Sequence, residues 1–222
     1  VTGAIKITGT MKNTSSEATS GTIVFYSDDG YQIPVSVASD GTYSVVLEGG
    51  DYTVYARSGS QVSISRLNVT ADAENNIDLK DGKSISGKTY WISSSNQMPF
   101  IPLAVNNITG CDGCSLALVS DATGSYSFYI PSGATCSITA TTADPFYYTT
   151  AGTYTKTEEN VSSTVNFTAS IEKIHITNGT AHKLTVGGTS ITAGSDADIT
   201  RTGPSMTVTI DEDDYYATAT LQ

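Results

Sequence analysis

Three cysteines are the residues of this sequence whose chemistry depends most on spacing. Cys111 and Cys114 enclose Asp112-Gly113 in the run CDGC, and Cys136 follows further along the chain. A redox CxxC motif needs a helix at its first cysteine, and no helical pattern surrounds this run. Asp-Gly is a signal for a type I′ hairpin turn, which would bring the flanking cysteines within disulfide range. We therefore predict a Cys111–Cys114 disulfide with Cys136 as a buried free thiol, and a Cys114–Cys136 bridge is the alternative.

Other candidate catalysts and ligands are sparse. His175 and His182 are seven residues apart, a spacing that does not place both on one face of a strand. No G-x-S-x-G elbow, P-loop, H-E-x-x-H or Rossmann fingerprint occurs, so we expect no enzyme. The acidic clusters Asp28-Asp29 and Asp211-Glu212-Asp213-Asp214 contain oxygen ligands of the kind that Ca²⁺ takes, although solvated turns are the plainer interpretation. No other cofactor is predicted.

Glycosylation is the modification that the sequence favours. Six asparagines lie in N-x-S/T sequons: Asn13, Asn68, Asn107, Asn160, Asn166 and Asn178. The chain is rich in the residues that complete such sequons, with 62 Ser and Thr among 222 residues. Even so, chance placement of its asparagines would produce only about three. The chain starts at Val1 without an apolar leader, as a mature secreted protein or a fragment would. These features predict an extracellular or cell-surface location and covalently attached N-glycans.

Composition excludes several partners. The formal net charge is −11 and the isoelectric point is about 4.3, so a nucleic-acid partner is not expected, because phosphate binding needs clustered Lys and Arg. No run of 18 apolar residues is present, and we therefore expect no membrane span. Charged residues make up only 15% of the chain, and Ser and Thr take their place. This composition suits the exposed faces of antiparallel sheets.

The elements that must position these residues are short β-strands. Apolar residues alternate with polar ones in the stretch 39–56, where Tyr43, Val45 and Leu47 are followed after Gly49-Gly50 by Tyr52 and Val54. This pattern predicts a β-hairpin. Similar stretches at 124–140 and 205–219 predict two more. No segment has a convincing 3.6-residue apolar period, so the expected class is all-β.

An internal duplication organises these strands. A shift of 83 residues places Gly41 on Gly124, Tyr43 on Tyr126 and Leu47 on Ile130, without a gap. Upstream, IKITGT at 5–10 matches SISGKT at 84–89 at a slightly different spacing. The duplication predicts a β-sandwich at 1–81 and a second at 82–172, with a smaller β-domain at 173–222.

The repeated motifs resemble a known family. The runs GTIVFY, DDG and SDGTYSVVLEGGDYTVYA resemble the carboxypeptidase regulatory-like domain, a transthyretin-like (prealbumin-like) sandwich, and are similar to the B-type repeats of bacterial surface adhesins. The resemblance covers Ile5 to Leu79 and Ile85 to about Ala169. It implies tandem Ig-like or transthyretin-like β-sandwiches of cell-surface or secreted proteins, used as spacers, stalks, filament parts or accessory domains.

Duplicated β-sandwiches without a recognisable catalytic motif predict either a structural protein or a binding module. We expect a secreted, glycosylated structural subunit of an extracellular filament, pilus-like fibre or surface layer. It would assemble with copies of itself through β-strand edges or strand exchange. One alternative is an adhesin or glycan-binding module that stacks sugars on Phe146-Tyr147-Tyr148 or Tyr215-Tyr216. Another is an accessory region of a larger secreted enzyme.

Overall fold

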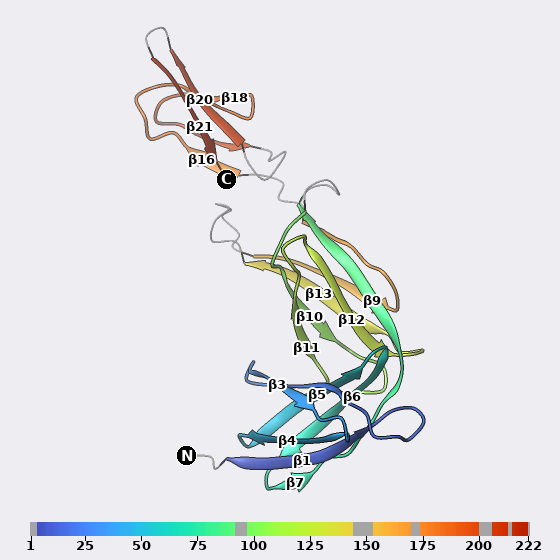
Figure 1. Ribbon diagram of the computed structural model, residues 1–222. Coiled ribbons are helices and arrows are strands. Elements are labelled where there is room, and N and C mark those ends of the chain that lie inside the picture. Colours follow the sequence, from blue (N-terminus) through green and yellow to red (C-terminus); the bar gives the residue numbers. More distant parts are fainter. Residues whose placement is uncertain are drawn as a thin grey trace.

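The computed structural model of the protein describes residues 4–91, 97–143, 153–169, 174–199, 206–212 and 215–221 (Figure 1). These residues form strands and turns and contain no helix, which confirms the all-β prediction. The strands make two sandwiches and a smaller third unit, and each of the three has its own cluster of buried apolar side chains.

The first sandwich packs two sheets face to face. One sheet has the order β4-β1-β7, with β8 also on β1, and its strands are β1 (Ile5–Lys12), β4 (Thr42–Leu47), β7 (Ala73–Glu74) and β8 (Ile77–Asp78). The other has the order β6-β5-β2-β3, with β2 (Gly21–Ser27), β3 (Gln32–Val37), β5 (Gly50–Ser58) and β6 (Gln61–Val69). Alternate residues of each strand point inward, as the period of two predicts, and the core they form includes Ile7, Phe25, Tyr43, Val45, Leu47 and Val54.

The stretch 39–56 does not form the predicted hairpin. β4 pairs with β1, whereas β5 pairs with β2 and β6 in the opposite sheet. The chain therefore crosses from one layer to the other at Glu48-Gly49. Stretch 124–140 behaves in the same way, because β12 pairs with β9 and β13 with β10 and β14. Only the third predicted hairpin is confirmed, as an antiparallel pair of β20 and β21.

The second sandwich repeats this arrangement. One layer holds β9 (Lys80–Trp91), β12 (Ser125–Pro131) and β15 (Phe167–Ala169). The other has the order β11-β10-β13-β14, with β10 (Pro102–Asn106), β11 (Leu116–Val119), β13 (Cys136–Ala143) and β14 (Thr153–Val161). Its core includes Ile85, Leu103, Tyr126, Phe128, Ile130, Ile138 and Phe167.

The pairing registers define how the first strands of the two repeats correspond. Gly9 lies opposite Tyr43, and Gly87 lies opposite Tyr126. The structural equivalent of Gly9 is therefore Gly87, one residue away from the alignment of IKITGT with SISGKT. Because neighbouring residues of a strand face opposite sides of the sheet, only the corrected register keeps equivalent side chains in the core.

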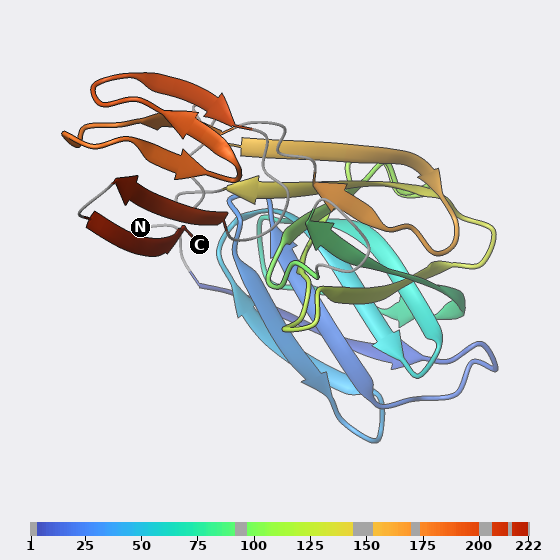
Figure 2. The same cartoon turned by 90° about the horizontal axis from the view of Figure 1, so that it is seen from above.

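The two sandwiches are fused through one strand and one interface (Figures 1 and 2). The predicted boundary between residues 81 and 82 falls inside β9, whose first residues pair with β6 of the first sandwich. The outer face of the β6-β5-β2-β3 sheet also packs on the second core through Val24, Tyr26, Tyr55 and Ile64. Burial there raises the pKa of Tyr26 to about 12, so its hydroxyl is neutral at physiological pH.

Polar contacts tie the same interface together. The backbone N–H of Tyr129 donates to the hydroxyl of Tyr55 at 3.1 Å, and the Arg57 guanidinium stacks 4.2 Å above the Tyr129 ring. Ser115 N–H donates to Thr53 Oγ1 at 3.0 Å, and the buried Thr53 hydroxyl also accepts from the Arg66 guanidinium. Specific bonds of this kind fix the orientation of the two sandwiches.

The third unit is small. Its strands β16 (Ile174–Thr177) and β19 (Asp196–Ile199) pair with each other, and a second sheet has the order β18-β17-β20-β21, with β17 (Leu184–Val186), β18 (Thr189–Ile191), β20 (Met206–Glu212) and β21 (Tyr215–Leu221). Among the side chains that the structure describes, its buried apolar cluster contains Leu184, Val186, Ile191, Ile199 and Met206. A core of this size stabilises only a small domain.

Candidate functional site

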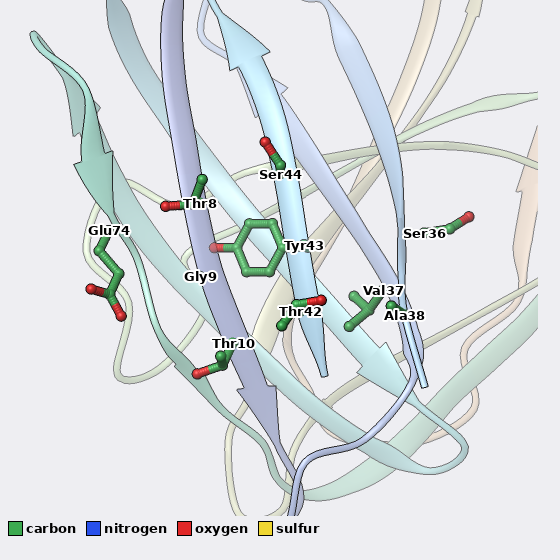
Figure 3. Close-up of a pocket in the computed structure, with 10 residues that line it drawn as sticks. All are labelled: Thr8, Gly9, Thr10, Ser36, Val37, Ala38, Thr42, Tyr43, Ser44 and Glu74. Atoms are coloured by element: carbon green, nitrogen blue, oxygen red, sulfur yellow. The ribbon is translucent and has the colours of Figure 1, made fainter. Parts of the chain in front are cut away.

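A groove on the first sandwich recurs on the second. The first, with a volume of about 650 Å³, lies over β1 and β4 and reaches the end of β3 (Figure 3). It is lined by Thr8, Gly9, Thr10, Ser36, Val37, Ala38, Thr42, Tyr43, Ser44 and Glu74. The second, of about 540 Å³, has the equivalent residues Ser86, Gly87, Lys88, Ser125, Tyr126 and Ser127 in its lining. The duplication therefore copied a surface as well as a core.

A glycine and a tyrosine build each groove. Gly9 has no side chain, so the Tyr43 ring lies over it, and the Tyr43 hydroxyl donates to the carbonyl oxygen of Asn75 at 2.5 Å. In the second sandwich, the Tyr126 hydroxyl donates to the carbonyl oxygen of Val165 at 2.5 Å. Both hydroxyls are thus used within the fold. They fasten the segment before β8 to β4 and the segment before β15 to β12.

The two grooves differ in their polar groups. The first is open and shallow, and its side-chain polar groups are those of Ser, Thr, Tyr and Glu74. The second places Lys88 where the first has Thr10, and adds Asp121 and Asn166. Glu74 is the one charged residue in the lining of the first groove, whereas the second groove contains both Lys88 and Asp121. Both linings suit weak contact with a polar ligand.

The cysteine prediction agrees with the structure in its pairing and differs in its turn. Cys111 and Cys114 form a disulfide with their Cα atoms 5.5 Å apart. Gly113 has a positive φ of 70°, but Asp112 does not, so the turn is not type I′. The cysteines lie in the loop between β10 and β11 rather than on paired strands. Cys136 is free and buried, and burial raises the pKa of its thiol to about 11.

Five of the six sequon asparagines lie where a glycan has access to the side chain. Asn68, Asn107, Asn160 and Asn166 are exposed, and Asn13 is half-buried. Their local bonds use only part of each amide. The Oδ1 atom of Asn166, for example, accepts from the backbone N–H of Lys88 at 2.9 Å and leaves Nδ2, the atom that carries an N-glycan, outside that bond. Glycosylation at these five positions stays a prediction.

Asn178 is a structural residue, and the glycosylation prediction there is corrected. Its side chain is fully buried in the third unit. Nδ2 donates to the carbonyl oxygens of His182 at 2.8 Å and Ile191 at 2.9 Å. Oδ1 accepts from the backbone N–H and the hydroxyl of Thr180. Both amide hydrogens are occupied, so no glycan fits on Nδ2 in this fold.

Of the two acidic clusters considered as cation ligands, only Asp28-Asp29 has described side chains. The Asp28 carboxylate is held by Arg66 through two bonds of 2.7 and 2.6 Å, which lower the pKa of Asp28 and raise that of Arg66. Among the residues that the structure describes, no group of three or more His, Cys, Asp or Glu is placed to hold a metal ion. Asp213 and Asp214 lie outside the described residues, as does the cluster Phe146-Tyr147-Tyr148. For Asp211, Glu212, Tyr215 and Tyr216, only the strand backbone is described.

His175 has two carboxylate partners. It lies opposite Asp198 across the β16–β19 pair, and its Nδ1 is 2.8 Å from Asp198 Oδ1. Its Nε2 is 3.6 Å from Asp196 Oδ2. The hydrogen bond to Asp198, with the charges of both carboxylates, raises the pKa of His175 above its usual value.

We expect the stability of the third unit to fall as pH rises through the pKa of His175. A raised folded-state pKa means that the ion pairs stabilise the fold at pH values below about 6.5, the usual histidine pKa, and are lost above the folded-state pKa. The effect is small because the ring is exposed. NMR titration of His175 alongside thermal unfolding measures it, with His175→Gln as control. An equal pH dependence in His175→Gln would contradict this assignment.

Sequence reasoning missed the residues that join the two sandwiches. Tyr55, Arg57 and Tyr129 contact one another across the junction, and none of the three belongs to a motif that the sequence alone identifies. The available signal was that Val24, Tyr26, Tyr55 and Ile64 place apolar side chains on the supposedly exposed face of their strands. A sheet that is apolar on both faces indicates a second packing partner.

Comparison with known proteins gives distant structural similarity only. No protein-family model and no curated protein matches the sequence. The Bacillus anthracis TIE protein matches at 11% identity and a TM-score of 0.32, over 99% of this chain and 48% of that one, so the chain spans about half its length. A DUF3823 family protein from Parabacteroides merdae matches at 12% and 0.31, over 63% of this chain and 92% of that one. The shaft pilin SpaA of Lactobacillus rhamnosus GG matches at 11% and 0.29, over 76% and 98%.

These values are too low to carry an argument about function. In the part of the chain that the structure describes, no helix is long and apolar enough to cross a membrane. The functional proposal therefore rests on the fold, the surface and the edges of this chain.

Proposed function

We propose that this protein is a secreted, N-glycosylated and non-enzymatic structural subunit. Copies of it would assemble with one another into an extracellular or cell-surface structure. The observation that carries the proposal is the fusion of two sandwiches into one body. β9 belongs to both sandwiches, and the buried face around Tyr26 and Tyr55 is shared between them. A junction of this kind holds a fixed angle under load, which a flexible linker does not do.

The surface supports the same role. Ser and Thr occupy many positions on the exposed faces of its strands. Five sequons with an exposed or half-buried asparagine are distributed over both sandwiches. The chain carries a net charge of −11, which keeps a subunit soluble before it assembles. The groove of the first sandwich offers hydroxyl groups and one carboxylate rather than a converging acid, base and nucleophile.

Two measurements test the proposal. Analytical ultracentrifugation and negative-stain microscopy of the full chain, over a wide concentration range, should show concentration-dependent assembly. Mass spectrometry of the protein from its natural source should find glycans at some of Asn13, Asn68, Asn107, Asn160 and Asn166, and none at Asn178. A chain that stays monomeric at every concentration would overturn the structural role.

A glycan-binding module is the second candidate, favoured by the duplicated groove. Two equivalent hydroxyl-lined surfaces on one rigid body suit a repeated polar ligand, because two weak contacts then act together. A glycan array separates the candidates. Glycan binding that is lost in both Ser44→Lys and Ser127→Lys would favour the glycan-binding module. An array without signal would leave the structural role as the remaining candidate.

A further inference from the structure

Edge strands decide where a β-sandwich can meet another chain. An unpaired edge presents free N–H and C=O groups to any extended segment, and native proteins blunt such edges with proline, charge, bulges or covering contacts. In the described part of the two sandwiches, the longer edge strands are β3, β4, β11, β12 and β14. The edges β7, β8 and β15 are only two or three residues long. β6 pairs with β9 only at Gln61 and Val62, and the rest of that edge carries the charged Arg66.

Two of the longer edges are protected by their own sequence. β3 contains Pro34, which has no N–H to offer to a further strand. β14 carries Glu158 and Glu159, and its register with β13 shifts between the pairs at Cys136 and Ile138. Charge and a bulge together make β14 a poor template.

Two further edges are covered at the junction of the sandwiches. On β11, the carbonyl oxygen of Ala117 accepts a hydrogen bond from the Gln32 side chain at 3.2 Å. On β12, the N–H of Tyr129 donates to the hydroxyl of Tyr55 at 3.1 Å. Backbone groups that would otherwise recruit a strand are therefore already used on both edges.

β4 is covered only at its first residue, where the Thr42 carbonyl oxygen accepts from the Ala38 N–H at 3.0 Å and the Thr42 N–H donates to Asp40 Oδ1 at 3.0 Å. From Thr42 to Leu47 it contains no proline, no glycine and no charge, and all six residues pair in unbroken register with β1. No described strand pairs with its other edge. Its outward residue Val46 is 58% exposed. Val46 and Tyr31, which is 67% exposed, line a separate groove of the first sandwich that runs beside this strand.

We propose that β4 is the self-assembly edge of this protein and pairs antiparallel with β4 of a second copy, which deepens the proposed function and rests on it. The occupant follows from charge. Two chains of net charge −11 repel each other, and β4 offers an approach without a charged side chain over six residues. An edge of this kind accepts a strand that is equally free of charge and has the same alternation, and β4 itself meets both conditions.

The alternation and the bonds of Thr42 together define the register. Inward residues must stay inward, and the Thr42 backbone is already bonded, so Ser44 and Val46 are the outward residues left to pair. Both are used when Ser44 lies opposite the partner's Val46 and Val45 lies opposite the partner's Val45. Tyr43 then lies opposite the partner's Leu47, and the two cores become continuous. Because the arrangement is two-fold symmetric, β4 forms a closed contact, and growth into a longer assembly needs a different surface.

Val46→Glu tests the proposal, with Val119→Glu as the matched control. Val119 is a β11 valine that is 61% exposed, so both variants add one carboxylate at an equally exposed edge position. In the monomer, the carboxylate at position 46 lies opposite Lys6 and is tolerated. Sedimentation equilibrium should show at least a tenfold weaker dimer for Val46→Glu and no change for Val119→Glu.

Cysteine cross-linking tests the register. The native cysteines do not interfere, because Cys111 and Cys114 are joined and Cys136 is buried. Mixing Ser44→Cys with Val46→Cys under mild oxidation should give more disulfide-linked dimer than either variant alone. Wild-type self-association that Val46→Glu leaves unchanged would overturn the β4 proposal and keep the proposed function. A monomeric wild type would overturn both.

Discussion

Replacing Gly87 with alanine is expected to lower the free energy of unfolding of the second sandwich by at least about 3 kcal/mol. A Cβ atom at this position would lie 1.7 Å from the carbonyl oxygen of Val165 and 2.6 Å from the hydroxyl of Tyr126. The first of these atoms belongs to the backbone and cannot rotate away. The segment before β15 would have to leave β9, and the Tyr126–Val165 bond would be lost with it. Urea denaturation followed by intrinsic fluorescence and circular dichroism measures the loss.

Gly133→Ala is the control for this prediction. Gly133 has a positive φ of 84° and no atom within 4 Å of the added Cβ. Only backbone strain opposes this substitution, at about 1 kcal/mol. If Gly87→Ala lost no more stability than Gly133→Ala, close approach of the backbone to β9 would not be what positions Val165. Gly9→Ala should behave like Gly87→Ala, since its Cβ would lie 2.0 Å from the carbonyl oxygen of Asn75.

Replacing Asn178 with alanine is expected to unfold the third unit and to leave both sandwiches intact. The substitution removes both donors to the His182 and Ile191 carbonyl oxygens, and each buried acceptor left without a partner costs about 1–3 kcal/mol. The third unit is small and has little stability with which to offset that loss. Hydrogen exchange resolved along the chain should show faster exchange in 174–199 and unchanged exchange in 4–91.

Asn68→Ala is the matched control, because Asn68 is exposed and its amide donates to a single side chain, that of Asp51. Its stability should stay within about 0.5 kcal/mol of the wild type. Asn178→Asp sharpens the test. It keeps an acceptor for Thr180 and turns the donor amide into an oxygen that faces two carbonyls, so it should be no more stable than Asn178→Ala. Retained protection of 174–199 in both variants would contradict a structural role for Asn178.

Much of the fold could be predicted from local pattern. Period-two alternation identified Tyr43, Val45 and Leu47 as inward residues, and all three are buried. The shift of 83 residues identified Tyr126 as the counterpart of Tyr43, and both hydroxyls donate to equivalent carbonyls. These features can be predicted from sequence because the direction of a side chain in a strand depends on the backbone alone.

The candidate site was less accessible to sequence reasoning. The CDGC spacing predicted the disulfide pairing, since two cysteines that flank a turn are close in any fold that contains the turn. The same logic failed for Asn178, because a sequon reports three residues and not the burial of the first. Burial of Asn178 depends on the carbonyls of His182 and Ile191, which only the folded third unit brings to it.

The sequence by itself determined the strands, the inward face of each strand and the duplication. Tertiary structure alone decided which strands are neighbours: β4 and β5, adjacent in the chain, belong to opposite sheets. It also decided that β9 joins both sandwiches and that no described strand pairs with the outer edge of β4. The physical reason is that alternation specifies which way a side chain points. Backbone N–H and C=O groups can pair with those of any strand, so packing between distant segments determines which strands become partners.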